Sequence, residues 1–168
     1  MSTYVLTYVS PIGELTLSSD GKSLTGLWIE GQKHFGGKVL DNMTIGSGNT
    51  SLPIFVDTIH WLDQYFKGEK PSISDLPLAP QGTEFQQRVW KLLYEIPYGE
   101  ITTYGELAEQ LHSSARAVGT AVGHNPISII IPCHRVIGAN GQLKGYAGGI
   151  ERKIWLLEHE KRGRSPFL

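Results

Sequence analysis

The sequence has few of the features that mark secreted, membrane or strongly charged proteins. Only one of its 168 residues is cysteine, so the chain can form no internal disulfide and has no second thiolate for a zinc site. Its longest apolar stretches, such as residues 127–132, are far too short to cross a bilayer. The first residues lack the basic flank and apolar core of a signal peptide. We therefore expect a cytoplasmic protein with no metal, no other cofactor and no membrane partner.

Neither sign of charge dominates, because 15 lysines and arginines face 16 aspartates and glutamates, for a net charge of −1. This balance excludes a histone-like polycation that binds nucleic acid by bulk charge. Residues 1–81 carry five basic and eight acidic residues (net −3), whereas residues 82–168 carry ten basic and eight acidic residues (net +2). A polyanionic partner should therefore meet the second half, with modest and salt-sensitive affinity.

The first half predicts a small domain of strands and one helix. Ser51 offers an N-cap and Pro53 a first-turn residue for a helix that ends at Gly68. Three segments rich in Tyr, Val, Leu, Thr and Ile, separated by Pro-Ile-Gly and Asp-Gly turns, predict an antiparallel meander over residues 4–9, 14–18 and 24–29.

A linker is predicted between the two halves. Residues 69–81 contain three prolines, a composition typical of an inter-domain connection. We therefore expect an N-terminal α/β domain over residues 1–68 and a second domain over residues 82–168. Nothing in the first of these domains suggests chemistry.

Short helices dominate the second half. Thr83 is the expected N-cap of the first of them. Thr103-Tyr104-Gly105-Glu106 matches the capping-box pattern and predicts a second helix through Leu111. Ser113 or Ser114 caps a third helix, which runs from residue 115 to about residue 122. The last two helices and their tight turn indicate a helix-turn-helix, although any helical hairpin gives a similar pattern.

The third helix is unusual for one that reads DNA sequence. Arg116 is its only long side chain, whereas readers of the major groove need several long polar side chains. A smooth helix with one arginine can instead press on a narrow groove without reading sequence. The same small residues would equally allow close packing against another helix, and the pattern alone leaves both interpretations open.

Cys133 follows an apolar run, residues 127–131, that predicts a buried strand or extended segment. A lone cysteine in such a place is usually part of the core. The following His-Arg pair favours the nucleophilic thiolate, although neighbouring side chains of an extended segment diverge, so His134 would need a water to reach the thiol. Glu160, near the end of a helix over residues 150–161, is either the group that orients His134 or a solvated charge.

Together these motifs resemble the O6-alkylguanine-DNA alkyltransferase family, also called methylated-DNA–protein-cysteine methyltransferases. The resemblance runs from Gly82 to Glu160. It rests on Pro132-Cys133-His134-Arg135-Val136, on Arg116-Ala117-Val118-Gly119, and on Thr103-Tyr104-Gly105 and Tyr146-Ala147-Gly148-Gly149. It implies an α+β protein in which a small ribonuclease H-like strand-and-helix domain precedes a mainly helical, helix-turn-helix domain that carries the active-site cysteine.

The resemblance also implies DNA repair by direct reversal. Cys133 would accept an alkyl group from O6 of guanine in double-stranded DNA, once per molecule, with O4 of thymine as a second candidate. His134 would take the thiol proton through a water, and Glu160 would hold His134. Asn125 would brace the turn before the cysteine segment. Tyr104 would help to rotate the nucleotide out of the duplex and would protonate the leaving base.

Contacts to the DNA are implied as well. Arg116 would fill the gap left by the flipped base, with Ala115, Ala117 and Tyr104 against the minor groove. The main chain of Cys133 and Val136 and the amide of Ala147 would contact the base, and Tyr146 would form a wall of the pocket. The turn over residues 111–115 departs from the family, being about two residues shorter and lacking the common Gly-x-Pro. The N-terminal half has no cysteine for the zinc site of some members, so we expect no metal, and we expect a monomer.

Two other classes compete with this interpretation. A non-catalytic lesion binder or helix-turn-helix regulator would need no acceptor cysteine, and Cys133 is present. A cysteine hydrolase using Cys133, His134 and Glu160 would place nucleophile and base awkwardly on adjacent residues. Turnover separates the three: a hydrolase makes many product molecules per protein, an alkyltransferase one, and a binder none.

Overall fold

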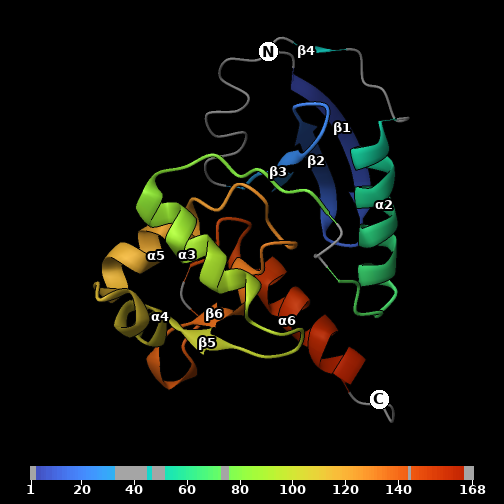
Figure 1. The fold of residues 1–168 in the computed structure, drawn as a ribbon. Helices are drawn as coiled ribbons and strands as arrows, with labels where there is room; N and C mark the ends of the chain where they lie inside the picture. Colours follow the sequence, from blue (N-terminus) through green and yellow to red (C-terminus); the bar gives the residue numbers. More distant parts are fainter. Residues whose placement is uncertain (1–2, 33–44, 47–51, 73–75, 144, 165–168) are drawn as a thin grey trace.

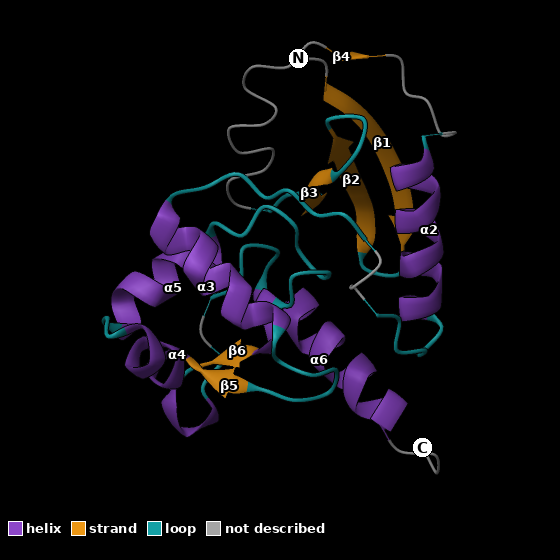
Figure 2. Cartoon of the chain, in the orientation of Figure 1, coloured by secondary structure: helices purple, strands orange, loops and turns teal. Residues whose placement is uncertain are grey.

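The computed structural model describes residues 3–32, 45–46, 52–72, 76–143 and 145–164. A sheet with one long helix forms the N-terminal part, and four helices with a two-stranded ribbon form the C-terminal part (Figures 1 and 2). This is the α+β architecture that the sequence predicts. Among the described residues, no helix has both the length and the apolar character needed to span a membrane.

The N-terminal sheet is the predicted antiparallel meander. It consists of β1 (Thr3–Ser10), β2 (Gly13–Ser19) and β3 (Leu24–Ile29). A two-residue strand, β4 (Ile45–Gly46), pairs parallel to β1 and gives the order β3-β2-β1-β4. Leucine and isoleucine side chains of β2 and β3 are buried in the core shared with the adjacent helix.

That helix, α2 (Pro53–Phe66), lies along the sheet and ends where the sequence predicts (Figure 1). Gly68 adopts φ +88°, and its amide donates to the carbonyl of Tyr65. The predicted cap is wrong, because the N-cap is Leu52, and Ser51 lies outside the described residues. Pro53 has a preset φ and no N–H that would need a cap, so the helix begins without a side-chain cap.

The C-terminal part begins with a well-capped helix. Its helices are α3 (Glu84–Tyr94), α4 (Tyr104–Leu111), α5 (Ala115–Gly123) and α6 (Ile150–Arg164). Thr83 caps α3 in a full capping box with Gln86. At α4 only half of the predicted box forms. The amide of Glu106 donates to Thr103, but the Glu106 carboxylate accepts from the Thr102 hydroxyl instead, at 2.7 Å.

Helices α4 and α5 form the predicted hairpin. Ser114, rather than Ser113, caps α5 and accepts a hydrogen bond from the amide of Ala117 at 3.1 Å. His112 ends α4 in the left-handed conformation at φ 52°, a position where glycine is the usual residue. The hairpin therefore turns without a glycine.

Residues 127–131 are buried as predicted, but they do not form an extended strand. Only Ile127 pairs with a strand, in an isolated bridge to Leu27 of β3. The chain then turns, Ile129 adopts φ 70°, and the amide of Ile131 donates to the carbonyl of Ile127. Tertiary contacts outweigh the strand preference of this β-branched run.

The outer edge of β3 joins the two parts of the molecule. The amide of Leu27 donates to Pro126 at 2.8 Å, and the amide of Ser128 donates to Leu27 at 3.0 Å. Leu24 exchanges two further backbone hydrogen bonds with residues 77–79 of the predicted linker. One apolar core runs through both parts, so the sheet supports the segment that leads to Cys133.

Candidate active site

Cys133 lies on the wall of a cavity of about 700 Å³ between the helical hairpin and residues 138–139 and 145–147. Its side chain lies at the beginning of a short 3₁₀ helix, η1 (Cys133–Arg135), which follows the buried turn. Five glycines also line the cavity and leave it wide. The predicted site residues on its wall are Tyr104, Ala115, Arg116, Cys133, Tyr146 and Ala147.

Asn125 holds the turn in front of η1. Its side-chain oxygen accepts from the amide of Ile127 at 3.0 Å, and its amide nitrogen donates to the carbonyl of Ile131 at 2.8 Å. Both ends of the five-residue turn are thus fixed by one buried side chain. This is the place that the sequence assigns to Asn125, between α5 and the cysteine segment.

The thiol of Cys133 is protonated at neutral pH. Burial raises its pKa, while the nearby Asn125 side chain and the Lys153 ammonium act in the opposite direction without overcoming it. Only 4% of the residue is exposed, on the cavity side. A nucleophilic reaction at this sulfur therefore needs a base that removes the proton.

His134 is placed to be that base. It is completely buried, and burial lowers its pKa more than the neighbouring Glu160 raises it, so the imidazole is neutral. Its Nε2 lies 2.5 Å from Oε2 of Glu160. Its Nδ1 is buried and has no hydrogen-bond partner among the described residues, which leaves this nitrogen able to take a proton through a water.

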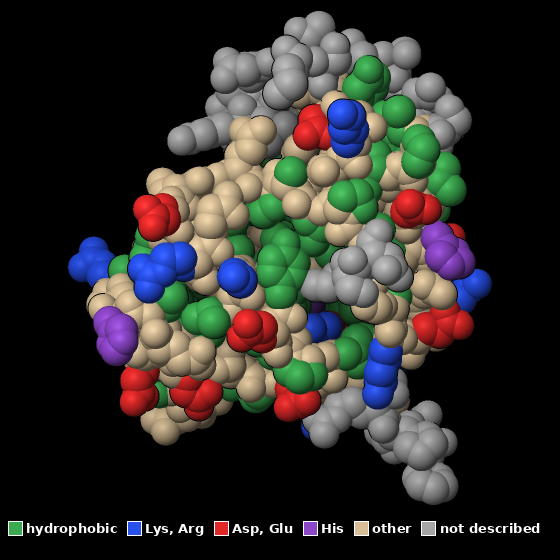
Figure 3. All heavy atoms as spheres, viewed as in Figure 1, with side chains coloured by type: hydrophobic (Ala, Val, Ile, Leu, Met, Phe, Trp, Pro, Cys, Tyr) green, Lys and Arg blue, Asp and Glu red, His purple; other side chains and the backbone are tan. Residues whose placement is uncertain are grey.

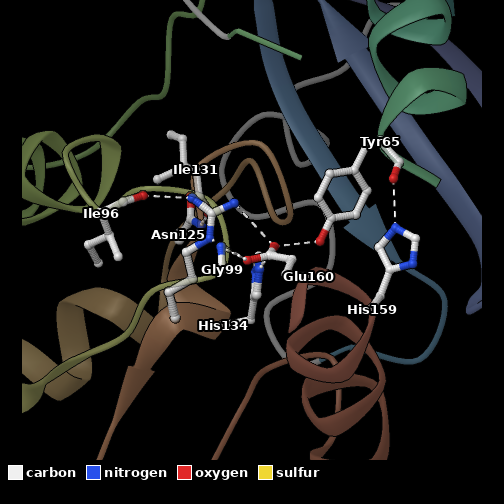
Figure 4. A network of polar contacts seen from close by, with 9 residues as sticks. Tyr65, Ile96, Gly99, Asn125, Ile131, His134, His159 and Glu160 are labelled. Atoms are coloured by element: carbon white, nitrogen blue, oxygen red, sulfur yellow. Dashed lines mark hydrogen bonds and ion pairs between the residues drawn. The ribbon is translucent and has the colours of Figure 1, made fainter. Parts of the chain in front are cut away.

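Glu160 is not a solvated charge at a helix end, because only 1% of the residue is exposed. Arg135 donates from Nε to Oε1 at 2.7 Å, the amide of Gly99 donates to Oε1 at 3.1 Å, and the Tyr65 hydroxyl donates to Oε2 at 2.6 Å (Figure 4). Burial pushes the pKa of Glu160 upward, but His134 and Arg135 outweigh it and the net pKa is lowered. The group is a buried carboxylate.

Arg116 is exposed at the mouth of the cavity. Helix α5 buries Val118, Ala121 and Val122 against the core, while Arg116 lies on its outer side. Figure 3 shows basic side chains over α3 and α5, the surface next to the cavity. Ala117 lines a shallower groove of about 430 Å³ beside it. The helix therefore combines close packing on one face with an outer face of small side chains and one arginine, Arg116.

Comparison with known proteins identifies the family. The model of the "6-O-methylguanine DNA methyltransferase, ribonuclease-like domain" matches residues 3–80, and that of the corresponding "DNA binding domain" matches residues 84–162. The chain belongs to the 6-O-methylguanine DNA methyltransferase family. The resemblance inferred from the sequence is thereby confirmed.

Individual members of this methyltransferase family are similar to this protein over nearly the whole length of its chain. The methylated-DNA–protein-cysteine methyltransferase of Mycobacterium bovis is 49% identical over 159 residues, which cover 94% of this chain and 91% of the relative. That of Haemophilus influenzae is 44% identical over 160 residues, covering 94% and 86%. A crystal structure of Mycobacterium tuberculosis OGT in complex with DNA has a TM-score of 0.81 at 47% identity, covering 97% and 94% of the two chains.

Sequence reasoning missed the part that three residues play at this methyltransferase site. Arg135 was noticed only as a cation near the thiol, yet its guanidinium holds Glu160 and the carbonyl of Ile96. Lys153 is buried on α6 and donates to the carbonyl of Val136 at 2.7 Å, 5.9 Å from the centre of the Tyr104 ring. Tyr65 lies in the half that suggested no chemistry.

Some residues that the sequence predicts for the methyltransferase site do not reach the cavity. His134, Glu160 and Asn125 lie in the buried layer behind Cys133. Val136 is fully buried, and its carbonyl accepts from Lys153, so it does not line the cavity wall. Tyr146 does line it, and burial raises the pKa of its hydroxyl well above the usual value, so that it stays protonated.

Proposed function

We propose that this protein repairs double-stranded DNA by moving an alkyl group from O6 of guanine to Cys133, once per molecule. The observation that carries the proposal is the arrangement of one thiol on a wide cavity wall, with a buried, neutral His134 behind it that contacts the Glu160 carboxylate. Family membership and relatives named methylated-DNA–protein-cysteine methyltransferases support it. The cytoplasmic location, the monomeric state and the division into domains over residues 1–68 and 82–168 remain predictions from the sequence.

The chemistry follows from the protonation states. His134 accepts the thiol proton through a water, and the resulting imidazolium is stabilised by the Glu160 carboxylate. The thiolate sulfur then bonds to the alkyl carbon as the bond between that carbon and O6 breaks. The Tyr104 hydroxyl, whose pKa is raised mainly by burial, donates a proton to the departing guanine, and the phenolate takes a proton back from solvent in the cavity. A thioether is a poor leaving group, so the thiol is not regenerated.

The target base must leave the duplex to reach this sulfur, at a cost of roughly a few kcal/mol. In the proposal Arg116 replaces it in the stack, while Ala115 and Ala117 allow α5 to lie close to the minor groove. Tyr146 and Ala147 line the space for the flipped base. Val136 lies in the buried layer behind that space. A non-catalytic lesion binder would need neither the neutral histidine nor the buried carboxylate.

Intact mass measurement tests the proposal directly. After incubation with excess duplex containing O6-methylguanine, we expect the protein mass to rise by one methyl group and then to stop. Peptide mapping should place the methyl group on Cys133. A methyl group on another residue, or more than one repaired guanine per protein, contradicts single transfer to this cysteine. An unchanged mass with the lesion still present in the DNA supports the lesion-binder alternative.

Arg116→Ala separates base flipping from chemistry. A free base such as O6-benzylguanine needs no extrusion, so the variant should react with it at nearly the parent rate. Repair of duplex O6-methylguanine should fall by at least about tenfold, because the vacated stack is no longer filled. The measurements are single-turnover rates with both substrates.

Arg88→Ala is the matched control for this variant, since Arg88 is an exposed arginine on α3 that does not line the cavity. Loss of a phosphate contact alone would weaken binding to any DNA and lower the salt slope by about one. If Arg116→Ala lowers the single-turnover rate equally with the free base and with the duplex, Arg116 supports the pocket, and the stack-filling role is wrong.

A further inference from the structure

The Glu160 carboxylate contacts a side chain of the N-terminal part of the molecule. Tyr65 lies on the last turn of α2 and is completely buried. Its hydroxyl donates to Oε2 of Glu160 at 2.6 Å, across 95 residues of sequence. Figure 4 shows the phenol pointing from α2 toward the Glu160 carboxylate on α6. The contact links the half without predicted chemistry to the carboxylate that holds the proposed base, His134.

Three donors compete at this oxygen, and the two shortest contacts are those of Tyr65 and His134. His134 Nε2 lies 2.5 Å from the same Oε2 that accepts from Tyr65, and Arg135 reaches it at a longer 3.1 Å. Each donor to a carboxylate oxygen withdraws charge from it and weakens it as an acceptor for the others. The proton affinity of His134 therefore depends on how strongly Tyr65 binds Glu160.

We propose that Tyr65 is a positioning residue for the alkyl transfer, which sets the strength of the Glu160–His134 contact from the N-terminal domain. This inference rests on the proposed function, in which His134 removes the thiol proton. Tyr65 touches neither the thiol nor the cavity wall. It acts only through the carboxylate.

Several charged and titratable groups surround the pair: burial lowers the pKa of one of them, Lys153, and the His159 ring lies 5.2 Å from that of Tyr65. Arg135 and Lys153 are the cations that face His134, and both oppose its protonation. The phenols that face Glu160, besides Tyr65, are Tyr98 and Tyr146. Burial raises the pKa of all three phenols, so each keeps its proton. The Tyr65 hydroxyl is thus a permanent donor to Glu160.

Tyr65→Phe removes the hydroxyl and keeps the ring. The ring stacks on Trp61 at 5.4 Å and meets the edge of Tyr98 at 5.9 Å, and phenylalanine can retain both contacts. Glu160 remains held by Arg135 and Gly99. Only the competition at Oε2 changes, and the contact between Glu160 and His134 becomes stronger.

The expected result is a shift in the pH dependence of the single-turnover rate with O6-methylguanine DNA. His134 acts in its neutral form, so the rate falls as the pH drops through its pKa. In Tyr65→Phe this acidic limb should move upward by about one pH unit, with the rate at high pH retained. NMR titration of the His134 imidazole should show the same upward shift without any DNA.

Tyr8→Phe is the matched control, because Tyr8 also donates to a carboxylate at 2.6 Å, that of Asp63, in the same part of the molecule. It should leave both profiles unchanged. If Tyr65→Phe does not fold, as judged by circular dichroism, 3-fluorotyrosine at position 65 replaces it. This stronger donor should move the His134 titration downward.

The outcomes separate the inference from the function on which it rests. Alkylation of Cys133 in the parent protein, with no shift of either profile in Tyr65→Phe, overturns the role of Tyr65 alone. A uniform loss of rate at every pH, with an unchanged His134 titration, also overturns it, because a structural defect has that signature. Failure of the parent protein to take up an alkyl group overturns the proposed function, while the NMR titration still tests the coupling.

Discussion

A Cys133→Ser variant should take up no alkyl group from O6-methylguanine DNA over hours, while it binds undamaged duplex as the parent protein does. The site already raises the pKa of a thiol by burial, and a hydroxyl in the same place gives up its proton far less readily. His134 is too weak a base to compensate. The substitution exchanges one sulfur atom for an oxygen atom in a residue that is 4% exposed, and it changes no charge.

Two measurements check this result. Intact mass reports transfer, and a fluorescence binding assay on undamaged duplex reports the DNA-binding surface proposed on α5, which the substitution leaves untouched. A parent sample saturated with methyl groups beforehand controls for spent protein. Transfer in the serine variant would show that the acceptor lies elsewhere. Loss of DNA binding together with loss of transfer would show that the cysteine segment shapes the surface.

Glu160→Gln should cost both rate and stability. The variant keeps the shape of the side chain but leaves the guanidinium of Arg135, 8% exposed, without its counter-charge. Breaking a buried ion pair from one side costs about 3–5 kcal/mol. Alkylation should slow as well, because the imidazolium of His134 loses the charge that stabilises it. Urea unfolding and single-turnover alkylation at neutral pH measure the two effects.

The pH dependence of unfolding adds a signature that only the carboxylate can give. Because the pKa of Glu160 is lowered in the folded protein, its stabilisation is fully present above the unfolded value of about 4.3. It is lost as the pH falls from there toward the folded pKa. The difference between parent and Glu160→Gln should therefore shrink on acidification.

Glu158→Gln is the control for this pair of measurements, since Glu158 is an exposed glutamate on the same helix. It should change neither rate nor stability noticeably. Equal stability of the parent and Glu160→Gln would mean that Arg135 is satisfied by the carbonyl of Ile96 alone, and that Glu160 does not stabilise the fold.

Features fixed by neighbouring residues could be predicted from the sequence. The N-cap at Thr83 and a cap at Ser113 or Ser114 were predicted, because caps depend on spacings of three residues, which a sequence displays. A capping box was expected at Thr103 with Glu106, where only half of it forms. The pairing of His134 with Glu160 was also predicted, although 26 residues separate them, because both belong to motifs of one known family. In each case the sequence itself carries the signal.

Features that depend on burial across distant segments could not be predicted. Nothing near Tyr65 distinguishes it from an ordinary core tyrosine, because its partner lies 95 residues away. Lys153 looks like one of several cations on a polar helix, yet folding buries it completely. The β-branched run at residues 127–131 favours a strand by propensity, whereas Asn125 and the edge of β3 hold it as a turn. Tertiary contacts decided each of these positions.

The contact between β3 and the turn before Cys133 also guards against aggregation. An edge strand with free backbone groups is a template for pairing with another chain. On β3, the outward amides of Leu24, Leu27 and Ile29 are all taken, by Pro77, Pro126 and the side chain of Gln32. The segment that presents the reactive cysteine thus covers part of this edge. Because these contacts are made by the backbone, a substitution that loosens the turn, such as Asn125→Ala, should lower the solubility of the protein.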